Sequence, residues 1–371
     1  MIMRLLFLFL APFLNPVYSY AQSRSINFEH GSISQALSKA DSANKLVFID
    51  CYTVWCGPCK AMAAHVFTQD SVADFFNSQF INVKMDMEKG EGISMKDKYH
   101  VEAYPTYLLL NGAGKLMYRF VGGMTSDSFM AKIRKGMNPS NKVAIINERY
   151  DAGERSKELL REYIQIKMDG REVSVGIKMC NEYFDMLTPE ERILPENWFL
   201  FGENKYSMYL SELHSRTFNY LADHWRDFAK VQGKAVVESK LRHMYLKIAG
   251  YTLRGWYFKN AHNEVFPYSK KEFDNYRRQI GRTELEDKKQ LITLIMIAQA
   301  AGEKDTVRVS ALLAKNIGGF SAENQRIGFD YISMIRNPRS TTIPHYQEVL
   351  DAIIQSNKNQ NLVRTARSYK K

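Results

Sequence analysis

The sequence predicts two folded parts: an α/β domain over residues 22–138, with a mixed sheet flanked by helices, and a mostly α-helical domain over residues 139–371. Strand-like and helix-like segments alternate up to residue 137, and the strand signals fade after Asn138-Pro139-Ser140-Asn141. A length of 371 residues suits two domains or three. With 45% hydrophobic residues, 25% charged residues and only 10 prolines, the chain is neither disordered nor collagen-like.

Residues 1–21 are predicted to be a secretory signal that is cleaved after Ala21. Arg4 precedes an apolar run from Leu5 to Leu14, which is too short to span a membrane. Ser19 and Ala21 supply the small residues that a cleavage site needs. We therefore expect an exported protein with no membrane span after cleavage. The longest later apolar run, residues 291–301, is expected to form a buried helix.

In the first domain the expected order of elements is α-β-α-α-β-α-β-β-α. The predicted strands cover residues 47–51, 80–85, 104–110 and 115–121. The predicted helices cover residues 32–43, 59–67, 71–77, 93–99 and 126–135. The segment Asn111-Gly112-Ala113-Gly114 separates the last two strands and predicts a hairpin turn.

The second domain is expected to contain stacked helical hairpins. An Ala-Gly-Glu pattern occurs at residues 152–154 and again at 301–303, and each predicts a helix that ends at a left-handed glycine, Gly153 or Gly302. No clean repeat period accompanies the pattern, so separate hairpins remain an alternative to a solenoid. The many aromatic residues here fit helix–helix core packing better than a partner groove, and Cys180 is expected to be buried in that core.

Most of the net charge of +11 lies in residues 139–371. A basic surface could favour acidic partners, but the sequence has no nucleic-acid motif, and a solvated surface explains the charge. No nucleic-acid partner is therefore expected.

The segment Trp55-Cys56-Gly57-Pro58-Cys59-Lys60 carries the clearest chemistry. Two cysteines three positions apart at a helix start can close a small disulfide ring. The helix N-terminus favours a thiolate on Cys56, which can attack a disulfide, and Cys59 can then resolve the mixed disulfide. A zinc site would need further ligands with metal-ligand spacing, and the sequence lacks them. No metal is expected.

Together with three further features, this motif resembles the thioredoxin family. Asp50, six residues before Cys56, matches the family's buried acid; Tyr104-Pro105-Thr106 matches its cis-proline loop; and Gly122-Gly123 matches the glycines after the last strand. The resemblance covers about residues 28–137 and implies a thioredoxin fold there.

The resemblance implies three catalytic residues. Cys56 would be the partly exposed attacking thiolate and Cys59 the buried resolving thiol. Asp50, with a pKa raised by desolvation, would exchange a proton with Cys59. No cofactor is expected, because the Cys56–Cys59 disulfide itself would be the redox-active group. A paired structural acid remains an alternative reading of Asp50, and Lys84 is the candidate partner.

Six further residues are implied to bind the substrate. Trp55 would shape the docking surface, although simple core packing is an alternative. Gly57-Pro58 would tune the helix start, and a cis Pro105 would present the Tyr104 backbone to an extended chain. The full implied set is Trp55, Gly57, Pro58, Tyr104, Pro105 and Thr106. In contrast to the family, Ala63-Ala64-His65 occupies the stretch where a kink proline is usual. Cys51 follows Asp50 on the same predicted strand, so its side chain is expected to face the opposite side of the sheet.

The function implied by the resemblance is that of an exported, periplasmic thiol–disulfide oxidoreductase. The Gly-Pro pair favours a reductase, whose partners would be disulfide-containing exported proteins and a membrane electron donor. One alternative is a disulfide oxidase or isomerase. Another is a binding or scaffold protein whose helical domain recruits partners.

Overall fold

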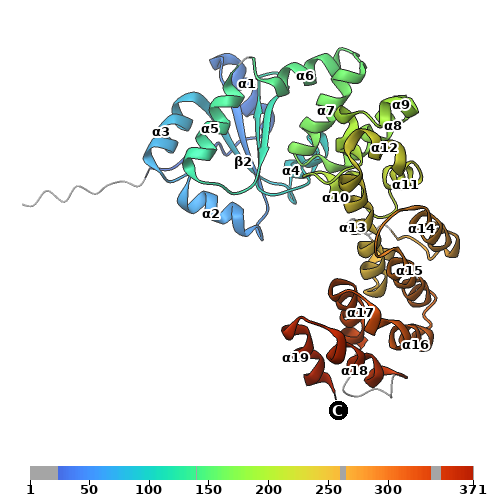
Figure 1. Ribbon diagram of the computed structural model, residues 1–371. Coiled ribbons are helices and arrows are strands. Elements are labelled where there is room, and N and C mark those ends of the chain that lie inside the picture. Colours follow the sequence, from blue (N-terminus) through green and yellow to red (C-terminus); the bar gives the residue numbers. More distant parts are fainter. Residues whose placement is uncertain (1–23, 139, 260–264, 336–343, 371) are drawn as a thin grey trace, which may run out of the picture. The chain divides into compact units, whose positions relative to one another are not determined.

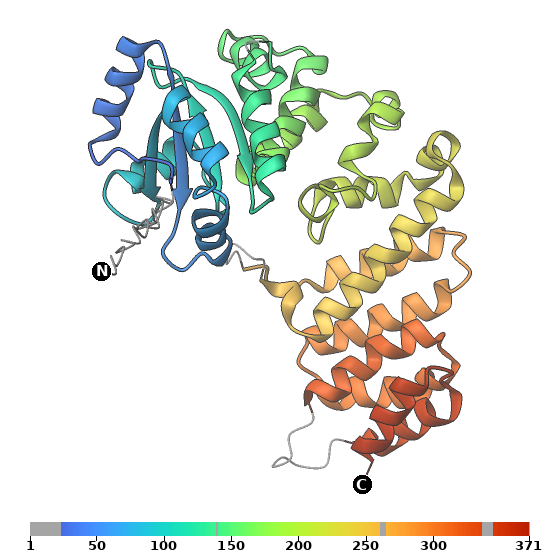
Figure 2. The same cartoon turned by 90° about the vertical axis from the view of Figure 1, so that its left-hand side faces the viewer.

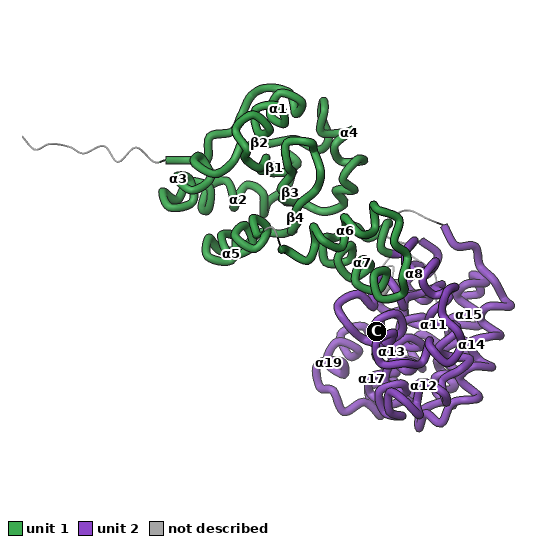
Figure 3. Tube along the Cα trace, turned by 90° about the horizontal axis from the view of Figure 1, so that it is seen from above, with its two compact units in different colours: residues 1–176 green, residues 177–371 purple. Residues whose placement is uncertain are grey.

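The computed structural model describes residues 24–138, 140–259, 265–335 and 344–370 (Figure 1). The predicted signal at residues 1–21 lies outside these ranges. The chain divides into two compact units, residues 1–176 and 177–371 (Figure 3). The predicted boundary after residue 138 is not the boundary between these units, because the first two helices of the helical half belong to the first unit.

A four-stranded mixed sheet organises the first unit. Its strands are β1 (Leu46–Tyr52), β2 (Phe80–Asp86), β3 (Thr106–Leu110) and β4 (Leu116–Val121), arranged in the order β2-β1-β3-β4. Strands β1 and β2 are parallel, whereas β3 is antiparallel to both β1 and β4. The helices are α1 (Ile33–Ala43), α2 (Gly57–His65), α3 (Asp70–Gln79), α4 (Glu91–Lys98) and α5 (Ser126–Met137). The predicted order of these nine elements, and the hairpin between β3 and β4, are confirmed.

The two faces of the sheet form separate cores, because successive side chains on a strand point to opposite faces. Phe48 of β1 lies in a core with side chains from α2, α3 and α5. Its neighbour Ile49 lies in the other core, with side chains from α1 and α4. Cys51 belongs to this second core, so the expectation that it faces away from Asp50 is confirmed.

Polar side chains fix where the helices begin. Ser32 accepts a hydrogen bond from the Gln35 amide, and the Gln35 side chain returns one to Ser32, which forms a capping box at the start of α1. Thr125 caps α5 more simply, because its side chain accepts a hydrogen bond from the Ser128 amide. Each cap satisfies a backbone N–H group that has no partner within its own helix.

Two helices and the start of a third complete the first unit. Helix α6 (Lys142–Asp151) lies against β4 and against α7 (Lys157–Asp169), and α8 (Val173–Met186) begins four residues after α7 ends. Gly153, between α6 and α7, has a φ of 94°. This backbone conformation is unfavourable for any residue that carries a side chain. The predicted left-handed glycine at this turn is confirmed.

The regular elements in the described part of the second unit are helices, apart from one isolated β-bridge between Lys259 and Val265. Its elements are α9 (Pro189–Arg192), η1 (Pro195–Leu200), α10 (Ser207–Leu210), α11 (Arg216–Asp223), α12 (Trp225–Gln232), α13 (Lys234–Leu253), η2 (Trp256–Phe258), α14 (Lys270–Arg282), α15 (Lys288–Gly302), α16 (Thr306–Asn316), η3 (Ile317–Gly319), α17 (Ala322–Ile335), α18 (Tyr346–Ser356) and α19 (Gln360–Tyr369). Consecutive helices contact one another from α14 to α16 and from α17 to α19 (Figure 2). Hairpins are therefore present, and a regular repeat stays a prediction.

Helix α15 contains the apolar run 291–301, whose helical state is confirmed. The second predicted left-handed glycine is wrong: Gly302 lies in the last turn of α15, and the positive φ of 61° belongs to Lys304. Gly302 instead allows close packing, because a Cβ there would lie 2.8 Å from the Tyr268 ring. Cys180, in α8, is buried as expected, and it and Cys51 are free thiols.

Candidate active site

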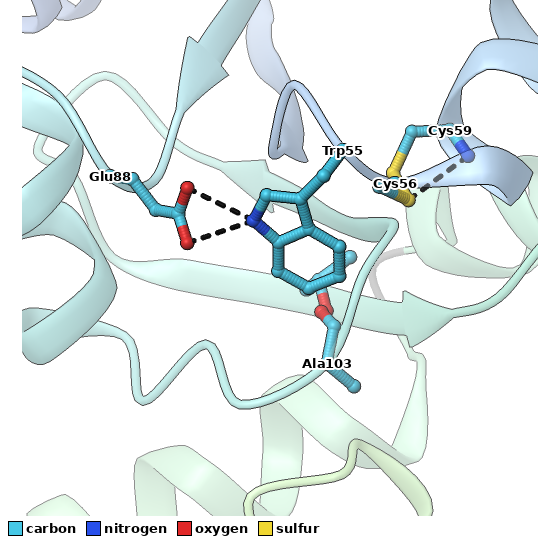
Figure 4. The surroundings of a disulfide bond; sticks show 6 residues. Trp55, Cys56, Cys59, Glu88 and Ala103 are labelled. Atoms are coloured by element: carbon cyan, nitrogen blue, oxygen red, sulfur yellow. Dashed lines mark hydrogen bonds between the residues drawn. A yellow bond between two sulfur atoms is a disulfide. The ribbon is translucent and has the colours of Figure 1, made fainter.

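The Cys56–Cys59 disulfide lies at the start of α2, directly after the short loop that follows β1. The two sulfur atoms are 2.04 Å apart. Cys56 is the N-cap residue of α2, and the Cys59 amide donates a hydrogen bond to its sulfur at 3.1 Å (Figure 4). Pro58 lies in the first turn, where a missing N–H costs nothing. This arrangement directs a backbone N–H and the positive end of the helix dipole at Cys56, and both favour a thiolate there.

Cys56 is only 3% exposed, and Cys59 is 5% exposed. The prediction that Cys56 is partly exposed is therefore wrong for the disulfide form. The reason is local, because the bond to Cys59 holds the Cys56 sulfur against the first turn of the helix. The prediction of a buried Cys59 is confirmed.

Asp50, on β1, is 1% exposed, and neither of its carboxylate oxygens has a hydrogen-bond partner within the described part of the chain. Burial raises the pKa of Asp50 to about 7, and the nearby Lys84 charge opposes part of that rise. Lys84 is the register partner of Asp50 on β2, but its own side chain is exposed. A carboxyl with this pKa can both accept and release a proton near neutral pH, as general acid–base catalysis requires.

Trp55 lies on the surface, with 64% of its side chain exposed, so the core-packing alternative is wrong. Its indole N–H donates to both carboxylate oxygens of Glu88, at 3.0 Å each (Figure 4). Its ring also meets the Tyr104 ring edge-on, with 5.9 Å between the ring centres. With Val54, also half exposed, Trp55 gives the disulfide an apolar surround. Sequence reasoning missed Glu88, whose only signal was its place in a charged loop.

The predicted cis-proline loop, residues 104–106, is the second part of the site. The Tyr104–Pro105 peptide is cis. The Thr106 hydroxyl donates to the Ala103 carbonyl at 2.7 Å, and Thr106 is buried, so this side chain holds the loop together. The Gly122 amide donates to the Pro105 carbonyl at 2.9 Å.

Gly57 and Pro58 are exposed beside the disulfide, and a Cβ on Gly123 would lie 3.4 Å from the Pro58 Cβ. The implied substrate-binding residues therefore surround the disulfide on α2 and the 104–106 loop. Their contact with a substrate stays a prediction.

The described residues offer neither a cluster of metal ligands nor a helix that could span a membrane. No group of three or more His, Cys, Asp and Glu side chains there is placed to hold a metal ion. Among the described helices, none is both long enough and apolar enough to cross a membrane.

Comparison with known proteins gives consistent matches to the first unit. The family model for thioredoxin matches residues 28–135. Thioredoxin H4 of Arabidopsis thaliana is 35% identical over 99 residues, which are 27% of this chain and 77% of that protein. Chloroplastic thioredoxin Y2 of the same plant is 32% identical over 96 residues, which are 26% of this chain and 54% of that protein.

A solved structure, that of a proposed disulphide-isomerase from Bacteroides thetaiotaomicron, is 45% identical. The match covers 32% of this chain and 99% of the other, with a TM-score of 0.31. For several of the curated relatives, the chain spans only about half of their length. The family match, the identity to thioredoxin H4 and the paired cysteines at the start of α2 show that this chain belongs to the thioredoxin family of thiol–disulfide oxidoreductases.

Proposed function

We propose that this protein is an exported reductase of protein disulfides. The observation that carries the proposal is the position of the Cys56 sulfur at the N-cap of α2, bonded to Cys59 and facing the Cys59 amide. A sulfur held there is stabilised as a thiolate once the disulfide is reduced.

In the first step, the Cys56 thiolate attacks one sulfur of a substrate disulfide. The substrate S–S bond breaks, a bond forms between Cys56 and that sulfur, and the other substrate sulfur leaves as a thiolate that takes a proton from solvent. The exposed Trp55 ring and the Tyr104 backbone would hold the substrate chain while this mixed disulfide exists.

In the second step, Asp50 accepts the proton of the Cys59 thiol, and the Cys59 sulfur attacks Cys56. The Cys56–Cys59 bond forms, and the second substrate sulfur leaves as a thiolate. Two electrons have then passed to the substrate. A pKa of about 7 fits Asp50 for this exchange. An external dithiol must return the electrons, and we assign that role to a membrane electron donor.

Substitution of the two cysteines tests the chemistry. With dithiothreitol as electron donor and insulin as the disulfide, Cys56→Ser should abolish catalysed reduction, because no attacking thiolate remains. Cys59→Ala should trap mixed disulfides on Cys56, visible by mass spectrometry. Undiminished turnover by Cys56→Ser would disprove the proposed chemistry.

The reduction potential of the Cys56–Cys59 pair tests the direction. A value near about −270 mV, typical of thioredoxin, would support a reductase, whereas one near about −120 mV would indicate an oxidase. Export is tested separately by expression in a Gram-negative host. We expect the mature chain in the periplasmic fraction, beginning at Gln22.

A further inference from the structure

The turn between α7 and α8 lies against the segment that leads into the cis-proline. We call residues 99–104 the approach segment and residues 170–174 the α7–α8 turn. The Glu102 carboxylate accepts hydrogen bonds from the Ser174 amide, at 3.2 Å to each oxygen, and another from the Ser174 hydroxyl. Both residues belong to the first compact unit. The approach segment is thus bonded to the first turn of α8.

A buried cluster of charges anchors the other end of the approach segment. One Arg119 nitrogen donates to the carbonyl oxygens of Tyr99, at 2.5 Å, and His100, at 3.1 Å. The other terminal nitrogen lies 2.8 Å from Glu172 in the α7–α8 turn, and both side chains are almost fully buried. Glu172 also pairs with Lys167 at 3.3 Å. The turn therefore holds the approach segment directly at Glu102 and indirectly, through Arg119, at Tyr99 and His100.

The α7–α8 turn also packs closely against Arg119, which holds the approach segment. A Cβ on Gly170 would lie 2.8 Å from the Arg119 side chain, so the α7–α8 turn lies directly against that arginine. Glu102 is exposed, and an exposed glutamate ordinarily samples many rotamers at an entropic cost to order. The Ser174 amide, in the first turn of α8, donates to this carboxylate and so favours one rotamer of Glu102.

These contacts lie next to the backbone that a protein substrate would contact and a small disulfide would not. Ala103 and Tyr104 follow Glu102 directly and are half-buried, and under the proposed function the Tyr104 backbone is where an extended polypeptide would lie. A small disulfide needs the Cys56 sulfur, but it has no chain that must lie along this backbone. A contact that fixes Glu102 should therefore matter more for the protein substrate.

We propose that Glu102 and Ser174 are positioning residues that hold the Ala103–Tyr104 backbone for protein substrates, so that the start of the helical extension contributes to substrate selection. The inference deepens the proposed function and rests on it. Neither residue touches the sulfur atoms, so the reduction potential of the disulfide should not change when they are replaced.

The test compares insulin with hydroxyethyl disulfide, using full-length Glu102→Ala, Ser174→Ala and the double variant. In Glu102→Ala we expect KM for insulin to rise about three- to tenfold, because water replaces part of the lost exposed hydrogen bonds, while kcat/KM for hydroxyethyl disulfide stays within about twofold. Ser174→Ala removes only the hydroxyl hydrogen bond and keeps those of the backbone amide, so its effect should be smaller. The double variant should not exceed Glu102→Ala, because that change alone already removes every hydrogen bond between the two residues. Ser174→Thr keeps both donors and should behave as wild type.

Glu162→Ala, on the exposed side of α7, is the matched control and should change neither substrate's kinetics. An unchanged KM for insulin in Glu102→Ala, or equal losses on both substrates, would overturn the positioning role. Hydrogen exchange of the approach-segment amides decides the same question without turnover. Faster exchange at Ala103 and Tyr104 in Glu102→Ala supports the proposal and unchanged exchange overturns it, even if wild-type protein reduces neither disulfide and the proposed function fails.

Discussion

Asp50 and Lys84 are direct register partners across the parallel strands β1 and β2, yet only the carboxyl is buried. The Lys84 ammonium lies 4.9 Å from the centre of the Tyr52 ring and remains exposed to solvent. The lysine charge therefore offsets only part of the desolvation of Asp50, whose pKa is raised to about 7. Near neutral pH the protonated and ionised forms of Asp50 are therefore both present.

This relationship predicts that Asp50→Asn stabilises the oxidised protein at high pH. The folded-state pKa of about 7 lies above the reference value of 3.8, so the wild-type carboxyl favours folding below pH 3.8 and loses that advantage as pH rises through 7. At pH 9 the variant should be more stable by about 4 kcal/mol, and the difference should vanish toward pH 4. Urea unfolding at pH 4, 7 and 9 measures it. The exposed Asp74→Asn should show no such trend, and equal stabilities of wild type and Asp50→Asn at pH 9 would refute the prediction.

Trp55→Ala should weaken the use of protein substrates without weakening the fold. Its side chain is mostly exposed, so the free energy of unfolding should change by less than about 1 kcal/mol. KM for insulin should rise several-fold because the largest apolar group beside the disulfide is gone. Glu88→Ala should have a smaller effect in the same direction, since the indole then loses its acceptor. The matched control is Trp256→Ala, also exposed but in the second unit; if it raises KM equally, the docking role of Trp55 is wrong.

Glu172→Gln should destabilise the first unit by about 3 kcal/mol. The change leaves Arg119 and Lys167 buried with no carboxylate between them, and removing one partner of a buried pair is costly. Glu162→Gln breaks an exposed pair with Lys142 in the same hairpin and should cost no more than about 1 kcal/mol. Thermal and urea unfolding of both variants would measure the difference. If both variants lost the same free energy of unfolding, the buried cluster would contribute no more to stability than the exposed pair.

Gly92→Ala should destabilise the loop that presents Glu88. A Cβ at this position would lie 1.9 Å from the Asp86 carbonyl oxygen, so the backbone must move, at a cost of about 1–3 kcal/mol. The Trp55–Glu88 hydrogen bonds should be lost with it, which an NMR shift of the Trp55 indole N–H would report. Gly281→Ala has open space within α14 and should instead stabilise the chain by up to about 1 kcal/mol. An unchanged stability of Gly92→Ala would show that the backbone around Gly92 can move without cost, contrary to the prediction.

The elements of the first unit could be predicted because local patterns and tertiary packing agree there. The buried runs that become β1 and β2, and the Asn111–Gly114 turn, each point to one structure. The paired cysteines could be predicted from their spacing at a helix start, and Asp50 from the resemblance to the thioredoxin family.

The partners of these residues could not be predicted, because they come from distant parts of the chain. Glu88 reaches Trp55 across 33 positions, and Ser174 reaches Glu102 across 72. No periodicity encodes such pairs. The misplaced turn at Gly302 has a related cause: glycine is chosen there for the space beside the Tyr268 ring, and the left-handed position falls on Lys304. A glycine in a sequence can indicate either close packing against the missing side chain or a backbone conformation with positive φ. Only the tertiary structure distinguishes the two.

Helix α6 covers β4, which is the last strand of the sheet, and at the opposite border Glu29 bridges to Val83 of β2. An enzyme that handles unfolded, extended chains is exposed to a particular hazard, because such chains can add to any bare strand and seed aggregates. With α6 against β4 and β2 partly paired, the Ala103–Tyr104 backbone would be the favoured place for a substrate chain to pair. The helical extension would then act as a guard against permanent capture of the enzyme by its own substrates.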